Sequence, residues 1–308
     1  MIVAIVGRKG GIGKTTISVN LSAALASRGL RILLVDLDAQ ASASRSLGVE
    51  RAELAPSIAD VLARGVPAGA ALRSTTVAGL DLMTASADVA SLDVALSAMS
   101  NKEHRLRLAL APLRESYDFI VLDCPPAQSL LTVNALVSAD RMLAPVVPQF
   151  LAIEGVQNLL GSTARIREST GSRVQALGLV LSMVDYRLKL TRQIVDGIRE
   201  QYGALVLGIE IRTNVRLAEA PAFGKTIFQH DPKASGAGLF QLLADEFLLR
   251  IGVPAERQRR LTAEPPAMGE RPPVGASREV SAAHPIPVSP GPTEEALAAT
   301  QAEVLRPN

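Results

Sequence analysis

Short apolar segments alternate with longer amphipathic segments along most of the chain. Runs rich in Val, Ile and Leu are typical of buried strands, and they occupy residues 2–6, 31–36, 80–84, 119–123, 141–147, 176–183 and 206–211. Segments with apolar residues at helical spacing lie at residues 17–27, 57–64, 89–97, 104–114, 130–138, 153–169, 191–202 and 238–249. Strands separated by helices predict an α/β fold, with a doubly wound, mostly parallel sheet and helices on both faces.

This alternation stops near residue 252. Ten of the 19 prolines fall within residues 252–308, and that stretch contains no aromatic residue. Such a segment cannot bury enough apolar surface to fold. We therefore expect a folded domain over residues 1–252 and a Pro-rich disordered tail over residues 253–308, in which residues 293–305 could form a short helix.

Composition narrows the classes of function. The chain has 308 residues and a formal net charge of +2, so any binding to nucleic acid needs a local basic patch. Cys124 is the single cysteine, which excludes an intramolecular disulfide and a Cys-rich metal or cluster site. The sequence shows no signal peptide before the first strand and no apolar run near the ~20 residues of a membrane span, so we expect a cytoplasmic protein.

A glycine-rich loop follows the first predicted strand. Residues 9–16 read Lys-Gly-Gly-Ile-Gly-Lys-Thr-Thr, between the strand at 2–6 and the helix at 17–27. Glycines let the backbone N–H groups of such a loop turn toward an anion, and the helix N-terminus adds partial positive charge. The order of strand, loop and helix predicts a phosphate-binding site.

Two lysines distinguish this loop. Lys14 is placed to reach the β- and γ-phosphates of a nucleotide, and the Thr15 hydroxyl is placed to hold Mg²⁺. The strict pattern G-x-x-x-x-G-K-[ST] would put its first glycine at Arg8, so this is a deviant version with Lys9 as an additional lysine. The loop thus predicts a site for nucleotide phosphates and Mg²⁺.

Carboxylates stand at the ends of two buried strands. Asp36 and Asp38 end the strand at 31–36, and Asp123 ends the strand at 119–123. Beside a phosphate loop, such acids can face Mg²⁺ or an attacking water, and Asp123 fits a Walker B element that holds a water on Mg²⁺. The alternative is that Asp36 and Asp38 only cap the following turn. Cys124 comes next and is interpreted as a buried structural thiol, with a redox sensor as the alternative.

A basic segment lies further along the chain, between residues 185 and 225. Its basic residues are Arg187, Lys189, Arg192, Arg199, Arg212, Arg216 and Lys225, with five acids interspersed. Taken alone, this composition is more often a solvated face than a DNA-binding surface.

Together these motifs resemble those of ParA/Soj-type partition ATPases, in the short form that lacks an N-terminal DNA-binding domain. The resemblance covers about residues 1–250 and is carried by residues 9–16, 36–40, 123–126, 131–136, 152–155 and 214–221. The chain departs from the family pattern at a few positions. Ala39 stands where proline is usual, Arg8 and Ala127 stand where other residues are commoner, and the usual Pro-Arg-Asn of the adenine loop reads Arg-Thr-Asn at residues 212–214.

The resemblance implies a role for each matching residue. The nucleotide phosphates would be bound by Gly10, Gly11, Ile12, Gly13, Lys14, Thr15 and Thr16. The Mg²⁺ site would be formed by Thr15, Asp36 and Asp123, and adenine would be held by Asn214 and Pro221. Arg187 and Arg216 would contact DNA non-specifically. Lys9 would cross a dimer interface to the partner's ATP, and Asp38 would position the hydrolytic water. Lys9, Lys14 and Asp38 are therefore the predicted catalytic residues.

The implied function is ATP-dependent segregation of a chromosome or plasmid. An ATP-bound sandwich homodimer would bind double-stranded DNA non-specifically, associate with the nucleoid without a membrane, and hydrolyse ATP with a ParB-like partner. A related ATPase that positions a protein cargo, and a MinD-like membrane switch, are the alternatives. Residues 293–303 are too acidic for the membrane helix of that switch. The single cysteine excludes an iron–sulfur ATPase, and the intact Lys14, Thr15, Asp38 and Asp123 disfavour a decayed one.

Overall fold

An eight-stranded sheet forms the centre of the protein in the computed structural model, which describes residues 1–126 and 129–253. Its strand order is β3-β4-β2-β5-β1-β6-β7-β8. The strands are β1 (Ile2–Ile5), β2 (Ile32–Asp36), β3 (Leu72–Ser74), β4 (Leu80–Met83), β5 (Phe119–Asp123), β6 (Arg141–Val146), β7 (Gln175–Val184) and β8 (Ile211–Arg212). Only β3 pairs antiparallel among these strands. Residues 254–308 of the predicted tail lie outside the described residues.

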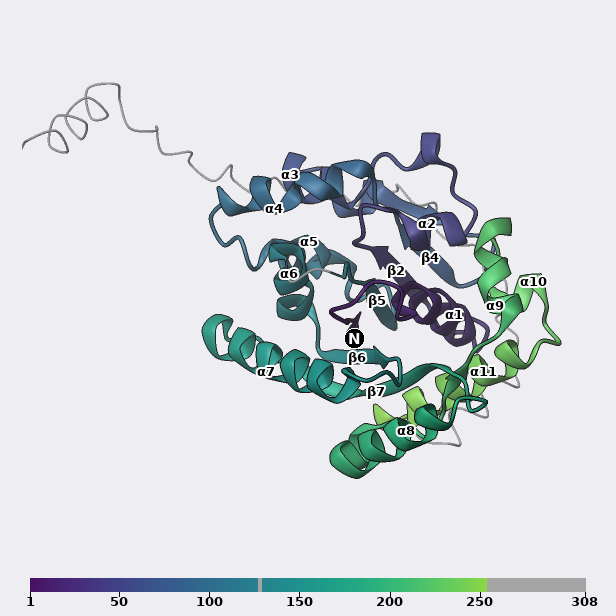
Figure 1. Ribbon diagram of the computed structural model, residues 1–308. Helices are drawn as coiled ribbons and strands as arrows, with labels where there is room; N and C mark the ends of the chain where they lie inside the picture. The colour runs from purple at the N-terminus through teal and green to yellow at the C-terminus, as the bar shows by residue number, and fades with distance from the viewer. Residues whose placement is uncertain (127–128, 254–308) are drawn as a thin grey trace, which may run out of the picture. The chain divides into compact units, whose positions relative to one another are not determined.

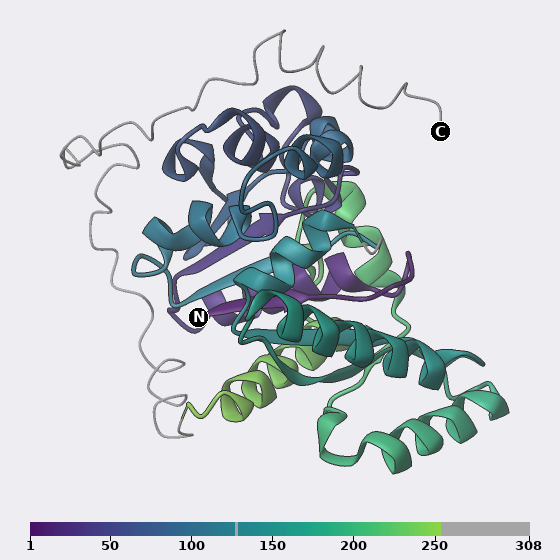
Figure 2. The same cartoon turned by 90° about the vertical axis from the view of Figure 1, so that its left-hand side faces the viewer.

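Helices cover both faces of this sheet, as Figures 1 and 2 show, so the predicted doubly wound α/β fold is confirmed. The helices are α1 (Lys14–Ala26), α2 (Ser42–Ser46), α3 (Ile58–Arg64), α4 (Leu92–Ser97), α5 (Arg105–Leu110), α6 (Leu130–Ser138), α7 (Ala152–Thr170), α8 (Lys189–Tyr202), α9 (Val215–Glu219), α10 (Ile227–His230) and α11 (Ser235–Arg250). In Figure 1, α5, α6 and α7 lie to the left of the sheet, and α1 and α11 lie to its right.

Each face of the sheet has its own apolar core. Helices α3 to α8 bury residues such as Ile58, Leu106 and Val195 in one core. On the opposite face α1 and α11 form the other core, where the rings of Phe119 and Phe247 meet edge to face with centroids 5.4 Å apart. Because the central strands are buried on both sides, they read as continuous apolar runs in the sequence.

Parallel pairing places the predicted acids at one edge of the sheet. In the register of β2 and β5, Asp36 lies opposite Asp123, and Ile5 at the end of β1 lies opposite Asp123 as well. The loop that follows β1 therefore starts beside Asp123, and Asp36 lies one strand further along the same edge. Ligands of doubly wound sheets bind at this carboxyl edge.

The predicted strand at residues 206–211 is wrong in extent. Only Ile211–Arg212 pairs with β7 as a strand, and Val206 adds an isolated bridge to Leu179. Between them, the N–H groups of Gly208 and Ile209 each donate to the Glu246 carboxylate of α11 over 2.9 Å. The Glu246 side chain thus accepts hydrogen bonds from N–H groups that would donate to a neighbouring strand if β8 were longer.

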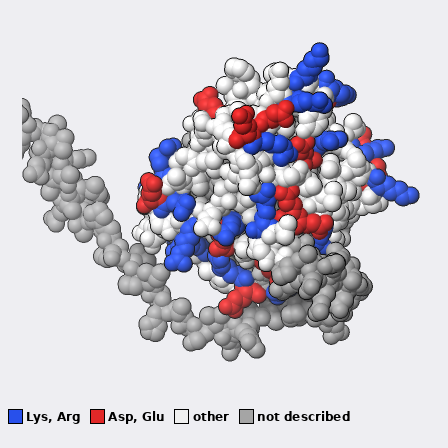
Figure 3. All heavy atoms as spheres, turned by 90° about the horizontal axis from the view of Figure 1, so that it is seen from below, with Lys and Arg blue, Asp and Glu red and all other residues white. Residues whose placement is uncertain are grey.

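The described surface carries charges of both signs. Figure 3 shows Lys and Arg side chains interspersed with Asp and Glu side chains on the face seen from below. In the described part of the chain, no helix combines the length and the apolar character that crossing a membrane requires.

Arg28 joins the two helices of the second core. It is 3% exposed, and its guanidinium donates to Asp245 (2.7 Å) and to the carbonyls of Ala24 (2.6 Å) and Gln241 (2.7 Å). We expect Arg28→Ala to lower the free energy of unfolding by about 2 kcal/mol, because it removes several hydrogen bonds made by a buried guanidinium between the two helices. Arg31, whose pair with Asp118 is exposed, is the control: Arg31→Ala should cost less than about 1 kcal/mol in the same urea titration.

Candidate functional site

The loop between β1 and α1 has the backbone shape of an anion cradle. Gly11 and Gly13 have positive φ angles of 71° and 87°, which residues with a side chain rarely adopt. A Cβ atom on Gly7 would lie 2.3 Å from Ile12 Cδ1. No described side chain caps the N-terminus of α1, so its first N–H groups face the loop and can receive an anion.

Lys14 and Thr15, the first residues of α1, point their polar atoms into this site. Lys14 is 7% exposed, and its Nζ donates to the carbonyl of Lys9 over 2.9 Å. The Thr15 hydroxyl donates to Asp123 over 2.8 Å, and the Ser18 hydroxyl donates to the other oxygen of the same carboxylate over 2.8 Å. Asp123 therefore orients the hydroxyl that the sequence predicted as a Mg²⁺ ligand, and Ser18 is a supporting residue that the sequence did not reveal.

Asp36 holds the Asp38 loop in place. Its carboxylate accepts hydrogen bonds from the backbone N–H and the hydroxyl of Ser44, both at 2.8 Å, and from the N–H of Asp38 at 3.1 Å. Asp38 itself is half-buried and accepts a hydrogen bond from the N–H of Gln40 at 3.0 Å. The two predicted acids of this strand thus differ in their surroundings: Asp36 is enclosed, and Asp38 borders an open cavity.

Burial sets the protonation behaviour of these groups. It raises the pKa of both Asp36 and Asp123, and the charge of Asp36 raises the pKa of Asp123 further. Burial also lowers the pKa of Lys14. Both carboxyl groups are therefore protonated more easily than exposed ones, and a cation bound nearby would favour their charged forms.

The donor set of the site fits Mg²⁺ bound together with a nucleotide. Among the described residues, no group of three or more His, Cys, Asp or Glu side chains could hold a metal by itself. Mg²⁺ typically uses one or two protein oxygens, phosphate oxygens and water. The Thr15 hydroxyl offers one such oxygen, and Asp123 accepts a hydrogen bond from it over 2.8 Å; its contact with Mg²⁺ stays a prediction.

A cavity of about 320 Å³ brings most of the predicted residues together. Those that line it are Gly10, Gly11, Gly13, Lys14, Thr15, Thr16, Asp38 and Pro221. An adjoining cavity of about 230 Å³ shares Gly13, Thr16 and Met183 with it and is lined by Asn214. The two cavities give room for phosphates at the loop and for a base beside Asn214.

Asn214 also has a structural task. Its side-chain oxygen accepts the N–H of Leu217 and caps α9, and its amide nitrogen donates to Ser235 over 2.9 Å. Contact of Asn214 with adenine stays a prediction.

The end of β7 supplies two site residues that the sequence did not reveal. Ser182 donates its hydroxyl to the carbonyl of Ile12 over 2.9 Å and so ties the phosphate loop to β7. Met183 has a positive φ of 52° and lines both cavities. A strained residue at a cavity of this kind is typical of a functional site.

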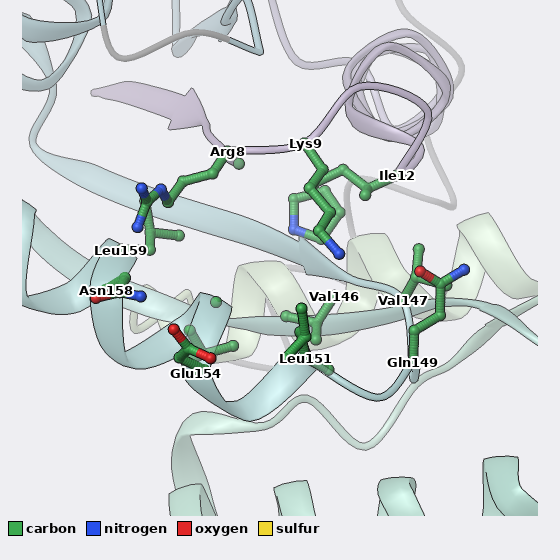
Figure 4. A pocket seen from close by; sticks show the side chains of 15 residues that line it. Arg8, Lys9, Ile12, Val146, Val147, Gln149, Leu151, Glu154, Asn158 and Leu159 are labelled. Atoms are coloured by element: carbon green, nitrogen blue, oxygen red, sulfur yellow. The ribbon is translucent and has the colours of Figure 1, made fainter.

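Lys9 and Ile12 face a different cavity. It has a volume of about 360 Å³ and lies between the phosphate loop and the start of α7 (Figure 4). The exposed Lys9 side chain projects over it, near Val146 and Leu151, and Arg8 extends toward Leu159. Among the described residues that line the 320 Å³ phosphate cavity, Lys9 is absent.

The two predicted DNA-binding arginines are exposed and paired with acids. Arg187 forms an ion pair with Asp185 at 2.5 Å, and Arg216 forms ion pairs with Glu219 at 2.9 Å and Asp231 at 3.5 Å. Binding of phosphate by either arginine would have to compete with these carboxylates.

The chain is similar to known proteins over most of its length. Residues 1–176 match a family model described as an AAA domain. The chain is 38% identical over 245 residues to the sporulation initiation inhibitor protein Soj of Bacillus subtilis, which covers 80% of this chain and 97% of Soj. It is 37% identical over 264 residues to the chromosome partitioning protein ParA of Caulobacter vibrioides, covering 85% of this chain and 97% of that protein.

A solved structure gives a similar result. The Mycobacterium smegmatis cobyrinic acid a,c-diamide synthase with bound ADP and magnesium has a TM-score of 0.69 and 30% identity, and covers 79% of this chain and 92% of its own. The phosphate loop, the strand-end acids and the doubly wound sheet define a P-loop ATPase that uses ATP and Mg²⁺. Within that class, the chain belongs to the ParA/Soj-type family of partition ATPases.

Proposed function

We propose that this protein partitions DNA through an ATP-dependent dimer. Two subunits would enclose two ATP molecules, bind double-stranded DNA without sequence preference on the nucleoid, and hydrolyse ATP to ADP and phosphate with a ParB-like partner to segregate a chromosome or plasmid. The similarity to a chromosome partitioning protein and the phosphate loop support this proposal.

The observation that carries the dimer is the different placement of two lysines in one loop. Lys14 is buried at the phosphate cavity, whereas Lys9 is exposed and lines the neighbouring cavity. Lys14 is therefore the cation for the phosphates of its own subunit. The Lys9 charge is available to phosphates that a second copy presents across an interface.

The residues of the site divide the work of hydrolysis. Lys14 and the loop N–H groups would hold the phosphates, and Mg²⁺ would neutralise charge that develops on them. Asp38, at the rim of the phosphate cavity, would orient the attacking water, while Asp36 fixes the loop that carries it. Cleavage removes the phosphate group that Lys9 contacts from the other subunit, so the dimer would lose its bridge.

Dimerisation would also control DNA binding. Two subunits present twice as many basic side chains as one, and affinity for DNA rises steeply with the number of phosphates contacted. ATP would then stabilise the DNA-bound state through its higher affinity for the dimer than for the monomer.

Replacement of Lys9 tests the dimer directly. In the presence of Mg²⁺ and ATP, we expect the wild-type chain to elute as a dimer in size-exclusion chromatography with light scattering, and Lys9→Ala to remain a monomer that still binds ATP. Lys102→Ala, which removes an exposed lysine elsewhere, is the matched control and should dimerise. A Lys9→Ala variant that dimerises like wild type would contradict the sandwich arrangement.

DNA binding should fall when Arg187 and Arg216 are removed. Because each of them exchanges a carboxylate for a phosphate, we expect Arg187→Ala and Arg216→Ala to weaken ATP-dependent binding only severalfold, and equally for unrelated duplexes. The log–log salt dependence should flatten by about 0.9 for each DNA phosphate that the variant no longer neutralises. Fluorescence anisotropy across a salt series measures both effects. Equal binding by both variants and wild type would mean that these arginines form only a solvated face.

A further inference from the structure

A different pair of arginines in the basic segment lacks carboxylate partners. Among the described residues, Arg192 and Arg212 form no ion pair, in contrast to Arg187 and Arg216. We propose that Arg192 and Arg212, gathered on the ring of Tyr186, form a principal phosphate-contacting cluster for duplex DNA. This proposal rests on the proposed function, since it assigns residues to the DNA surface of the ATP-bound dimer.

The cluster is held together by the aromatic ring. The guanidinium carbon of Arg212 lies 5.6 Å from the centroid of the Tyr186 ring, and that of Arg192 lies 5.8 Å from it. Arg192 belongs to α8 and Arg212 to β8, so the ring joins two elements. Both arginines are exposed, whereas Tyr186 is half-buried.

Tyr186 is itself fixed from below. Its hydroxyl donates to the Glu210 carboxylate, with distances of 2.8 and 2.9 Å to the two oxygens, and Arg199 donates to the same carboxylate at 2.8 Å. The Glu210 side chain is 13% exposed. A ring anchored in this way is a rigid platform, and guanidinium groups held over it by cation–π attraction lose less conformational freedom when they bind an anion.

The charge balance of the cluster favours a polyanion. Arg199 compensates Glu210, so the charges of Arg192 and Arg212 are left over. Asp196, one turn further along α8, forms no ion pair with Arg192 in the described part of the chain. Two uncompensated, preorganised guanidinium groups contrast with Arg187, which must release Asp185 before it can bind phosphate.

Guanidinium chemistry points to phosphate oxygens as the ligand. A guanidinium held near an aromatic ring by cation–π attraction can still direct N–H groups toward solvent, and its paired N–H donors match the geometry of phosphate. Contacts of this kind read no base, in agreement with binding that is independent of sequence.

Phosphate has two possible sources near Arg212. This residue also lines the cavity that contains Asn214, where a bound nucleotide would lie. Arg192 does not line that cavity. The DNA backbone is the better match, because the cluster includes Arg192 on the exposed surface of α8, away from the nucleotide cavity. The experiment below distinguishes binding of DNA phosphate from binding of nucleotide phosphate.

The experiment uses the full-length chain, Mg²⁺ with ATP, and two fluorescein-labelled duplexes of unrelated sequence, with anisotropy recorded from ~50 to ~200 mM salt. We expect Arg192→Ala and Arg212→Ala each to weaken binding at least about fivefold for both duplexes and to flatten the log–log slope by about 1.8, which is about 0.9 for each of two subunits. Arg107→Ala on α5 removes an exposed arginine elsewhere and should leave binding unchanged.

Variants of Tyr186 and Arg192 separate the effect of charge from the effect of the cation–π contact. Tyr186→Phe keeps the ring but loses its hydrogen bond to Glu210, so we expect it to weaken binding less than Tyr186→Leu does. Tyr186→Leu removes the ring and should weaken binding as the arginine variants do. Arg192→Lys keeps the charge without the planar group, so we expect an affinity between those of Arg192→Ala and wild type. ATP-dependent dimerisation is recorded for every variant, which identifies any loss of DNA binding that comes from loss of the dimer.

The outcomes distinguish this proposal from the proposed function. If wild type binds DNA only with ATP, and the Arg192 and Arg212 variants bind equally well with an unchanged salt slope, the cluster assignment is overturned and the partition function stands. If Arg212→Ala weakens ATP binding while the DNA slope stays that of wild type, the phosphate belongs to the nucleotide and the cluster assignment is overturned as well. If wild type does not bind DNA in either nucleotide state, the proposed function itself fails.

Discussion

Lys14→Ala should abolish measurable ATP binding. Lys14 is the first residue of α1, is 7% exposed, and places its ammonium group directly beneath the phosphate loop. Burial strengthens its interaction with phosphate, because little water competes for the charge. We expect at least a ~100-fold loss of affinity, which corresponds to about 2.7 kcal/mol.

Titration of the full-length protein with fluorescent ATP in the presence of Mg²⁺ measures this loss. Lys233→Ala removes an exposed lysine outside the site and is the matched control. Because Lys14→Ala also removes a buried charge, its thermal unfolding should be recorded beside it to show that the fold is intact. A folded Lys14→Ala variant that binds ATP with wild-type affinity would disprove the assignment of the phosphate site.

The parts of this protein that could be predicted from the sequence are those encoded by contiguous residues. The loop at residues 9–16 and the strands that end in Asp36 and Asp123 are each a local pattern, and they give the fold as well as the phosphate cavity. Because parallel strands place their carboxyl ends at one edge, even the meeting of Asp36 with Asp123 follows from the pattern.

Contacts between distant segments could not be predicted in the same way. The hydroxyls of Ser18 and Ser182 bond to Asp123 and to Ile12, which lie 105 and 170 residues away in the sequence. A lone serine carries no local signal for such a bond. The same reason explains β8, whose predicted extent was wrong because Glu246 takes the hydrogen bonds of Gly208 and Ile209.

Short elements escaped prediction for another reason. The helices α2, α9 and α10 and the strand β3 have five residues or fewer. A pattern of that length fits several conformations, and tertiary contacts decide between them. In α2, the contact of Ser44 with Asp36 is one of those that decide.

The count of basic residues did not predict which arginines are free to bind DNA. The segment at 185–225 shows an excess of basic residues, but which of them carry uncompensated charge depends on how the chain folds. Arg187 meets a carboxylate two residues away, while Arg192 and Arg212 meet a tyrosine ring. The arginine that resembles a family position is thus not the one whose charge is most available.

Asp38→Ala should bind ATP and fail to hydrolyse it. Asp38 borders the phosphate cavity, while Lys14 donates to the Lys9 carbonyl and Thr15 donates to Asp123, so removal of Asp38 leaves the phosphate-binding groups in place. Loss of an acid that orients an attacking water lowers turnover by about 100-fold or more. If hydrolysis is what opens the dimer, the variant should remain dimeric as long as ATP is present.

Light scattering over several hours after addition of Mg²⁺ and ATP, with phosphate release assayed in parallel, measures both consequences. Asp38→Asn is the sharper variant, because its amide oxygen can still accept the N–H of Gln40 and so keeps the loop geometry. Glu115→Ala removes an exposed carboxylate elsewhere and should behave as wild type. Since ATP binding is retained, a persistent dimer would show that Asp38 acts after ATP binding and before the dimer separates. A variant that stays monomeric with ATP and still hydrolyses it would contradict both the water-orienting role and the coupling of the dimer to the γ-phosphate.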